Sequence, residues 1–235
     1  MTSPTTGAAV DERVRERLVL GLDVGDLSAA EAMASAVSPW FATVKVGHEL
    51  YAEAGPKAFD RMHELGFRVF CDLKLHDIPN TVERAARAHA RHGVDFMNAH
   101  AAGGTAMLRA FVDGARAGAA DVGREPPVTL AVTVLTSERD THAFDERLAW
   151  ASEAACDGVV CSGDEIGKAT AAGMRTMVPG IRLPGGAAND QARVATPSGA
   201  TAAGATWMVI ARAVTAAPDP AEAAAQVARD VAACL

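Results

Sequence analysis

Short β-branched or apolar segments alternate with longer alanine-rich segments of helical spacing along this chain. The predicted strands are residues 18–24, 41–47, 67–74, 94–100, 128–135, 158–161, 174–180 and 207–211. The clearest predicted helices between them are residues 28–37, 56–65, 81–91, 105–117 and 221–232, several of which begin with Ser, Thr or Pro. This alternation is typical of a parallel sheet whose strands are connected by helices.

Eight strand–helix units in a chain of 235 residues predict a closed (β/α)8 barrel of the triosephosphate isomerase type. The alternative is an open, doubly wound sheet, which usually carries a G-x-G-x-x-G turn after its first strand. Here that turn reads Asp23-Val24-Gly25-Asp26. We therefore expect a single barrel domain over residues 15–235, preceded by a flexible polar tail over residues 1–14.

Charge and composition exclude several classes of partner. The net charge is −7 and the chain has no Lys/Arg run, whereas a nucleic-acid surface needs a basic face. No segment has eighteen uninterrupted apolar residues, so we expect no membrane span and a cytoplasmic location. The four cysteines include no C-x-x-C pair, which indicates neither a disulfide framework nor a zinc site.

Polar residues follow or end most of the predicted strands. Because parallel barrel strands all point the same way, these residues are expected to meet in one mouth. Buried strand ends seldom carry many charges unless the charges are paired or bind a ligand. The residues concerned are Asp23, Lys45, Asp72, Lys74, His100, Thr136, Ser137, Arg182 and Arg212.

Asp72 and Lys74 lie two residues apart on one predicted strand, so their side chains point to the same face. Lys45 on the neighbouring strand can join them in a Lys–Asp–Lys array. One such pair at ~4 Å contributes roughly 4 kcal/mol at an effective dielectric near 20, before desolvation. The alternative to a catalytic array is a buried ion-pair network that only stabilises the barrel mouth.

The segment after this strand reads His76-Asp77-Ile78-Pro79-Asn80-Thr81. Proline makes continuation of the strand unfavourable, and Asn80 or Thr81 is expected to cap the next helix. Asp77 is therefore predicted to lie on a loop, where a plain turn residue is the simpler interpretation.

The sequence DLKLHDIPNT at residues 72–81 resembles the signature segment of the orotidine 5'-phosphate decarboxylases. Shorter segments resemble the bacterial members in the same order, at residues 22–24, 45–47, 134–137, 179–182, 190–191 and 210–214. The resemblance covers residues 18–217. It implies a homodimeric (β/α)8 barrel that converts orotidine 5'-monophosphate to uridine 5'-monophosphate and CO₂ in pyrimidine biosynthesis, with no cofactor and no metal.

By matching positions, the resemblance implies that Lys74 is the proton donor, that Asp72 and Lys45 share its charge network, and that Asp77 reaches into the dimer partner's site. The implied substrate-binding positions also include Asp23 and Thr81 at the ribose, Ile78, Thr136 at the pyrimidine, and Arg182, Gln191, Ala211 and Arg212 around the 5'-phosphate. The family usually has glycine at the position of Ala211. A backbone amide contact to phosphate there requires a conformation open to an L-residue.

The chemistry agrees with these residue types. Loss of CO₂ from C6 leaves a carbanion that the ring delocalises poorly, so a fixed ammonium is an appropriate electrostatic stabiliser and acid. One rival is a Mg²⁺-dependent sugar-phosphate decarboxylase or aldolase of the same superfamily, but Lys45 stands where a magnesium site requires a carboxylate. The other rival is a non-catalytic nucleotide-phosphate sensor, which has no need of the Asp72–Lys74 pair.

Overall fold

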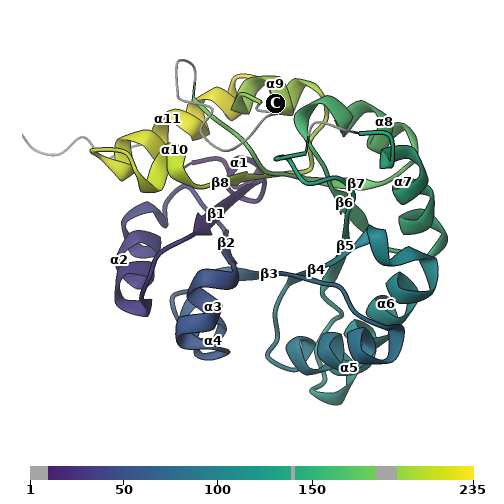
Figure 1. Ribbon diagram of the computed structural model, residues 1–235. Helices are drawn as coiled ribbons and strands as arrows, with labels where there is room; N and C mark the ends of the chain where they lie inside the picture. The colour runs from purple at the N-terminus through teal and green to yellow at the C-terminus, as the bar shows by residue number, and fades with distance from the viewer. Residues whose placement is uncertain (1–9, 139–140, 184–194) are drawn as a thin grey trace, which may run out of the picture.

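The computed structural model describes residues 10–138, 141–183 and 195–235, and its strands close into a parallel barrel (Figure 1). Neighbours in sequence are neighbours in the barrel, and β1 also pairs with β8. This closure confirms the predicted barrel and excludes the open sheet. The strands are β1 (Leu18–Leu22), β2 (Thr43–Val46), β3 (Arg68–Leu75), β4 (Phe96–His100), β5 (Val128–Val132), β6 (Gly158–Val160), β7 (Arg175–Val178) and β8 (Trp207–Ile210).

Helices surround the barrel on the outside (Figure 1). No helix within the described ranges is long and apolar enough to cross a membrane. The α-helices are α1 (Glu12–Arg15), α2 (Leu27–Val37), α3 (His48–Ala54), α4 (Lys57–Glu64), α5 (Pro79–Ala90), α6 (Gly104–Asp121), α7 (Phe144–Glu153), α8 (Ile166–Ala171), α9 (Pro197–Ala202), α10 (Arg212–Thr215) and α11 (Pro220–Ala232). The described residues also include two 3-10 helices, η1 (Ala101–Gly103) and η2 (Gly163–Glu165).

Two expectations about helix starts need correction. Helix α5 begins at Pro79 with Ile78 at the N-cap, and no side chain caps it, whereas Asn80 or Thr81 was the expected cap. Proline fits this place because the first helical turn leaves its N–H groups without intrahelical partners, so a missing N–H costs nothing. Helix α3, directly after β2, was not predicted; it has no side-chain cap and is only seven residues long.

The packed part of the chain begins earlier than predicted. Helix α1 lies inside the segment expected as a tail, and Asp11 caps it by accepting a hydrogen bond from the N–H of Arg13 at 2.9 Å. Val14 is 1 % exposed and belongs to the core. This apolar side chain anchors the helix. The predicted tail, residues 1–14, therefore extends at least three residues too far, because residues 12–14 belong to α1. Residues 1–9 lie outside the described part.

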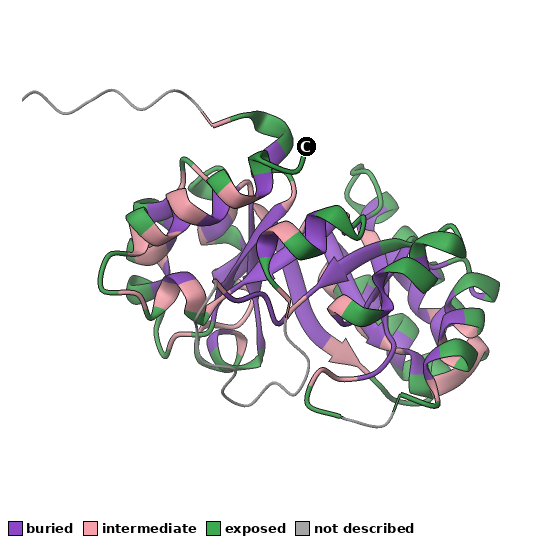
Figure 2. Cartoon of the chain, turned by 90° about the horizontal axis from the view of Figure 1, so that it is seen from above, coloured by how far each residue is buried: buried purple, intermediate pink, exposed green. Residues whose placement is uncertain are grey.

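The core has two layers. Figure 2 shows that most of the strands are buried, whereas the helices carry exposed residues. The larger layer lies between the strands and the surrounding helices. The smaller fills the barrel interior, where the ring centroids of Phe96 and Trp207 are 5.1 Å apart and those of Phe70 and Phe96 are 6.2 Å apart. These aromatic rings close the barrel below the carboxyl ends of the strands, so the open space lies at the mouth.

Candidate active site

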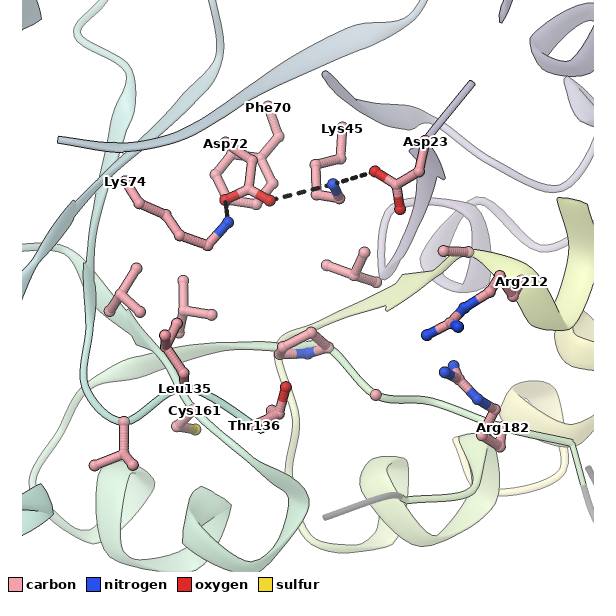
Figure 3. Close-up of a pocket in the computed structure, with 17 residues that line it drawn as sticks. Asp23, Lys45, Phe70, Asp72, Lys74, Leu135, Thr136, Cys161, Arg182 and Arg212 are labelled. Carbon is pink, nitrogen blue, oxygen red and sulfur yellow. Dashed lines mark hydrogen bonds and ion pairs between the residues drawn. The ribbon is translucent and has the colours of Figure 1, made fainter. Parts of the chain in front are cut away.

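A cavity of about 240 Å³ lies at the carboxyl end of the barrel (Figure 3). Eight of the predicted site residues line it, and they come from six different strands or the segments directly after them. His100 and Ser137, also at strand ends, do not line it. The predicted residues in the lining are Asp23, Lys45, Asp72, Lys74, Thr136, Arg182, Ala211 and Arg212.

Four of these side chains form one row of alternating charge (Figure 3). The Nζ atom of Lys45 lies 3.0 Å from Asp23 Oδ1 and 3.2 Å from Asp72 Oδ2. Lys74 Nζ donates to Asp72 Oδ1 at 2.7 Å. The Lys–Asp–Lys array expected from the sequence is therefore present, and Asp23 extends it by one further charge.

Asn98 on β4 holds this array from behind, and sequence reasoning missed it. Its Nδ2 donates to Asp72 Oδ1 at 2.7 Å, and its Oδ1 accepts from the backbone N–H of Lys74 at 2.7 Å. Lys74 has a left-handed backbone, with φ of 48°, where the β3–β4 pairing shifts register. The available signal was a polar side chain in an otherwise apolar stretch of strand, between Met97 and Ala99.

Lys45 and Asp72, the two most buried members of the array, are both charged at neutral pH. Burial, the largest influence on Asp72, would raise its pKa, but the charges of Lys45 and Lys74 and the hydrogen bonds it accepts together lower that pKa below the ordinary value. Burial would likewise lower the pKa of Lys45, yet Asp72 and Asp23 raise it. Each charge thus keeps its neighbour charged within a site of low exposure.

The opposite wall of the cavity is apolar. Beside it stands Thr136, one of the few uncharged polar side chains in the lining (Figure 3). A mostly apolar wall with a few fixed polar groups suits a flat heterocyclic ring, which is bound by contact and oriented by hydrogen bonds. Sequence reasoning did not identify this wall, because its members look like ordinary core residues: Phe70, Val132, Val134, Leu135, Val160, Cys161 and Val209.

Two arginines define the other end of the cavity. In Figure 3 the guanidinium groups of Arg182 and Arg212 converge, and they lie on the opposite side of the cavity from Lys74. Arg182 follows β7, and its backbone N–H donates to Ala195 O at 2.9 Å. Converging guanidinium groups favour an anion such as phosphate, which they can contact with several hydrogen bonds. Ala211 has a φ of −121° and a ψ of −105°, so it does not use the left-handed conformation that favours glycine.

Three predicted residues do not line this chain's own cavity. Asp77, Ile78 and Thr81 are exposed on the loop after β3 and the first turn of α5. Ile78 is 66 % exposed, the highest value among the large hydrophobic residues that the structure describes. Asp77 does lie on a loop, as expected, and its Oδ1 accepts from the N–H of Ile78 at 2.6 Å. Gln191, expected near the 5'-phosphate, lies outside the described residues.

A mouth of this kind, with paired lysines and aspartates at one end and arginines at the other, places the chain among (β/α)8-barrel enzymes that act on anionic substrates. The chain belongs to the orotidine 5'-phosphate decarboxylase / HUMPS family, whose model matches residues 16–227. This membership confirms the resemblance found in the sequence.

Curated relatives agree with this assignment. The chain is 44% identical over 233 residues to the orotidine 5'-phosphate decarboxylase of Moorella thermoacetica, with 92% of each chain covered. It is 46% identical to the same enzyme of Halorhodospira halophila, covering 92% of this chain and 96% of the relative. A crystal structure of orotidine 5'-phosphate decarboxylase from Lactobacillus acidophilus matches with a TM-score of 0.76 at 32% identity, covering 92% and 99%. The predicted enzyme class, a carboxy-lyase on a (β/α)8 barrel, is thereby confirmed.

Proposed function

We propose that this chain converts orotidine 5'-monophosphate to uridine 5'-monophosphate and CO₂, with Lys74 as the proton donor. The observation that carries the proposal is the arrangement of one cavity: a charged row beside an apolar wall, and two arginines at the far end. The pyrimidine then lies between the wall and Lys74, near Thr136, and the 5'-phosphate lies at Arg182 and Arg212.

The reaction follows from the charges. The bond between C6 and the carboxylate carbon breaks, CO₂ departs, and the electron pair stays on C6. The Lys74 ammonium stabilises this developing charge, then transfers a proton to C6 and regains one from water. Asp72 holds that ammonium at 2.7 Å and places a second negative charge near the departing carboxylate. The fixed charges need no reorganisation during the reaction.

The rival functions fit the site less well. A Mg²⁺ site requires oxygen ligands, but Lys45 lies between the carboxylates of Asp23 and Asp72 and would repel a cation there. A sensor that only binds a nucleotide phosphate has no use for two lysines around a buried aspartate. As a purely structural network, such a buried row is a costly way to gain stability.

We also propose that the enzyme is a homodimer in which Asp77 of one subunit completes the site of the other. The exposure of Asp77, Ile78 and Thr81 outside their own cavity supports this assignment. An exposed isoleucine beside the site is well suited to a subunit interface. A twofold axis would deliver both loops reciprocally, so each site would use Lys74 from one chain and Asp77 from its partner.

Subunit exchange tests the shared site. Lys74→Ala and Asp77→Ala proteins are each expected to be nearly inactive. In a mixed dimer one site carries both changes and the other carries neither. Random exchange makes half of the dimers mixed, so activity should return to about a quarter of the parent value. A mixture that stays inactive after exchange has been shown by mass spectrometry would place both residues in one chain's site.

The activity itself is tested by following the ultraviolet absorbance of orotidine 5'-monophosphate with purified protein in excess EDTA. Turnover in EDTA is expected, since Lys45 occupies the place that a metal would need. Absence of turnover with and without added Mg²⁺ would refute the proposed reaction. Turnover that appears only with Mg²⁺ would instead support the metal-dependent rival. The cytoplasmic location remains a prediction from the sequence.

A further inference from the structure

We propose that Asn98 is a positioning residue for the reaction, because its single amide group fixes both the Asp72 carboxylate and the backbone of Lys74. The inference rests on the proposed function in one respect, namely that these two residues act on the substrate. Asn98 itself is 1 % exposed and does not line the cavity. Any effect it has on turnover therefore passes through its two partners.

The hydrogen bonds determine how the amide is oriented. The backbone N–H of Lys74 is a donor, so the atom that meets it at 2.7 Å must be the carbonyl oxygen of Asn98. The amide nitrogen then faces Asp72 and donates to Oδ1 at 2.7 Å. That oxygen also accepts from Lys74 Nζ at 2.7 Å, so both of its partners are donors. Asn98 thus favours the ionised carboxylate and holds it in place.

The same amide supports an unusual backbone. Lysine seldom adopts a positive φ, and Lys74 does so where regular β3–β4 pairing is interrupted between Cys71 and Leu75. The side-chain oxygen of Asn98 accepts from the Lys74 N–H at this irregular point. The direction in which the lysine stem leaves β3, and hence the place of Nζ, depends on that contact.

Few charged or titratable groups among the described residues surround Asn98. Asp72 and Lys74 face it from β3, and Lys45 faces the far oxygen of Asp72 from β2. On its own strand, His100 lies two residues on, and burial followed by the charge of His76 lowers the pKa of that histidine. The register partner of Asn98 on β5 is the uncharged Leu130.

The first test is Asn98→Ala. Loss of both hydrogen bonds lets the ammonium move, and a displacement of about 1 Å in a reacting group can lower turnover about 100-fold. We expect kcat to fall by that factor, with KM changed less than about threefold, as for an interaction used only in the transition state. The control is Thr129→Val, which removes a buried 2.8 Å hydrogen bond to Asp157 near the opposite end of the barrel. Its kcat should equal that of the parent.

The second test, Asn98→Asp, distinguishes positioning from packing. When protonated, the introduced carboxyl group can accept from the Lys74 N–H and donate to Asp72, as the amide does. When ionised, it cannot donate and repels Asp72. Burial and this like charge raise the pKa of the introduced group. We expect kcat of Asn98→Asp to rise as the pH falls from about 8 to about 6. The parent is the control for His100, which both proteins contain, and its kcat should show no such rise.

Two kinetic results would overturn the inference: a kcat of Asn98→Ala within threefold of the parent, or a pH profile of Asn98→Asp that parallels the parent's. If Asn98→Ala does not fold, the pH profile decides alone. A crystal structure adds a readout independent of activity, since Lys74 should leave its left-handed conformation in Asn98→Ala. An unchanged Lys74 there would refute the inference. An inactive parent protein would refute the proposed reaction, and the conformation of Lys74 would then decide the inference separately.

Discussion

Replacing Lys45 by methionine tests the energetics of the charged row, because methionine keeps most of the stem and removes the charge. The pair Lys45–Asp72 has side chains only 11% and 10% exposed, with the charged atoms 3.2 Å apart. Coulomb's law gives about 5 kcal/mol for such a pair at an effective dielectric near 20, before desolvation. Removing one partner of a buried pair costs about 3–5 kcal/mol. We expect about 3 kcal/mol, since Lys74 and Asn98 still contact Asp72.

The pH dependence of this loss has a definite sign. The folded-state pKa of Asp72 is lowered, so its ion pairs contribute stability above its unfolded pKa, and that stability is lost as the pH falls through the folded pKa. In Lys45→Met one fewer cation opposes burial, so the pKa of Asp72 rises. The difference in stability between parent and variant is therefore complete at pH 7. It narrows as the pH falls, first through the raised folded pKa of Asp72 in the variant and then through the lowered one in the parent.

Urea unfolding followed by circular dichroism at pH 7 and at the lowest pH where both proteins fold measures this difference. Lys168→Met is the matched control. Its ion pair with Asp145 has a similar distance, 2.9 Å, but the side chains are 63% and 72% exposed, so its loss should cost at most about 1 kcal/mol. The reasoning is refuted if Lys45→Met costs no more than the control, or if its cost is the same at both pH values.

Three further substitutions have expected outcomes. Lys74→Ala should abolish decarboxylation with the circular dichroism spectrum unchanged. A variant that keeps a tenth of parental turnover would show that Lys74 is not the proton donor. Arg212→Ala should raise KM and lower kcat in steady-state assays, because phosphate binding far from C6 also positions the ring; unchanged kinetics at limiting substrate would remove Arg212 from phosphate binding. Gly21→Ala should cost about 1–3 kcal/mol in urea unfolding, because its Cβ would lie 2.9 Å from Ala211 Cβ, and Ala211→Gly should restore the loss.

The sequence predicted the barrel and the place of the site for one shared reason. Alternating strand and helix segments give parallel strands, and parallel strands bring their carboxyl ends together. Asp23, Lys45, Asp72 and Arg182 are far apart in sequence, yet strand order alone brings them to one cavity. Local features were predicted less well. Helix α3 has no cap to mark it, and the start of α5 depends on a proline at the first helical position.

The apolar wall and Asn98 show why the rest of the site was not predictable. A residue such as Val160 or Val209 has the same sequence character whether it packs inside the barrel or faces a ligand, because only the height of its strand position relative to the aromatic layer decides. Asn98 reads as one polar residue in a strand. Its contribution depends on a register shift in the neighbouring strand, which no periodicity reports.

The orientation of the Lys74 ammonium illustrates the same limit at the level of one side chain. Alternation along a regular strand places Asp72 and Lys74 on the same face, which predicts that they are neighbours. Lys74, however, has a positive φ, which is not a regular strand conformation. At this residue the backbone N–H donates to the side chain of Asn98 on β4. The pairing of Asp72 with Lys74 therefore follows from residues 72–74 alone. The direction of the ammonium is a property of two strands together, which is why substitution of Asn98 tests the site without removing any of its charges.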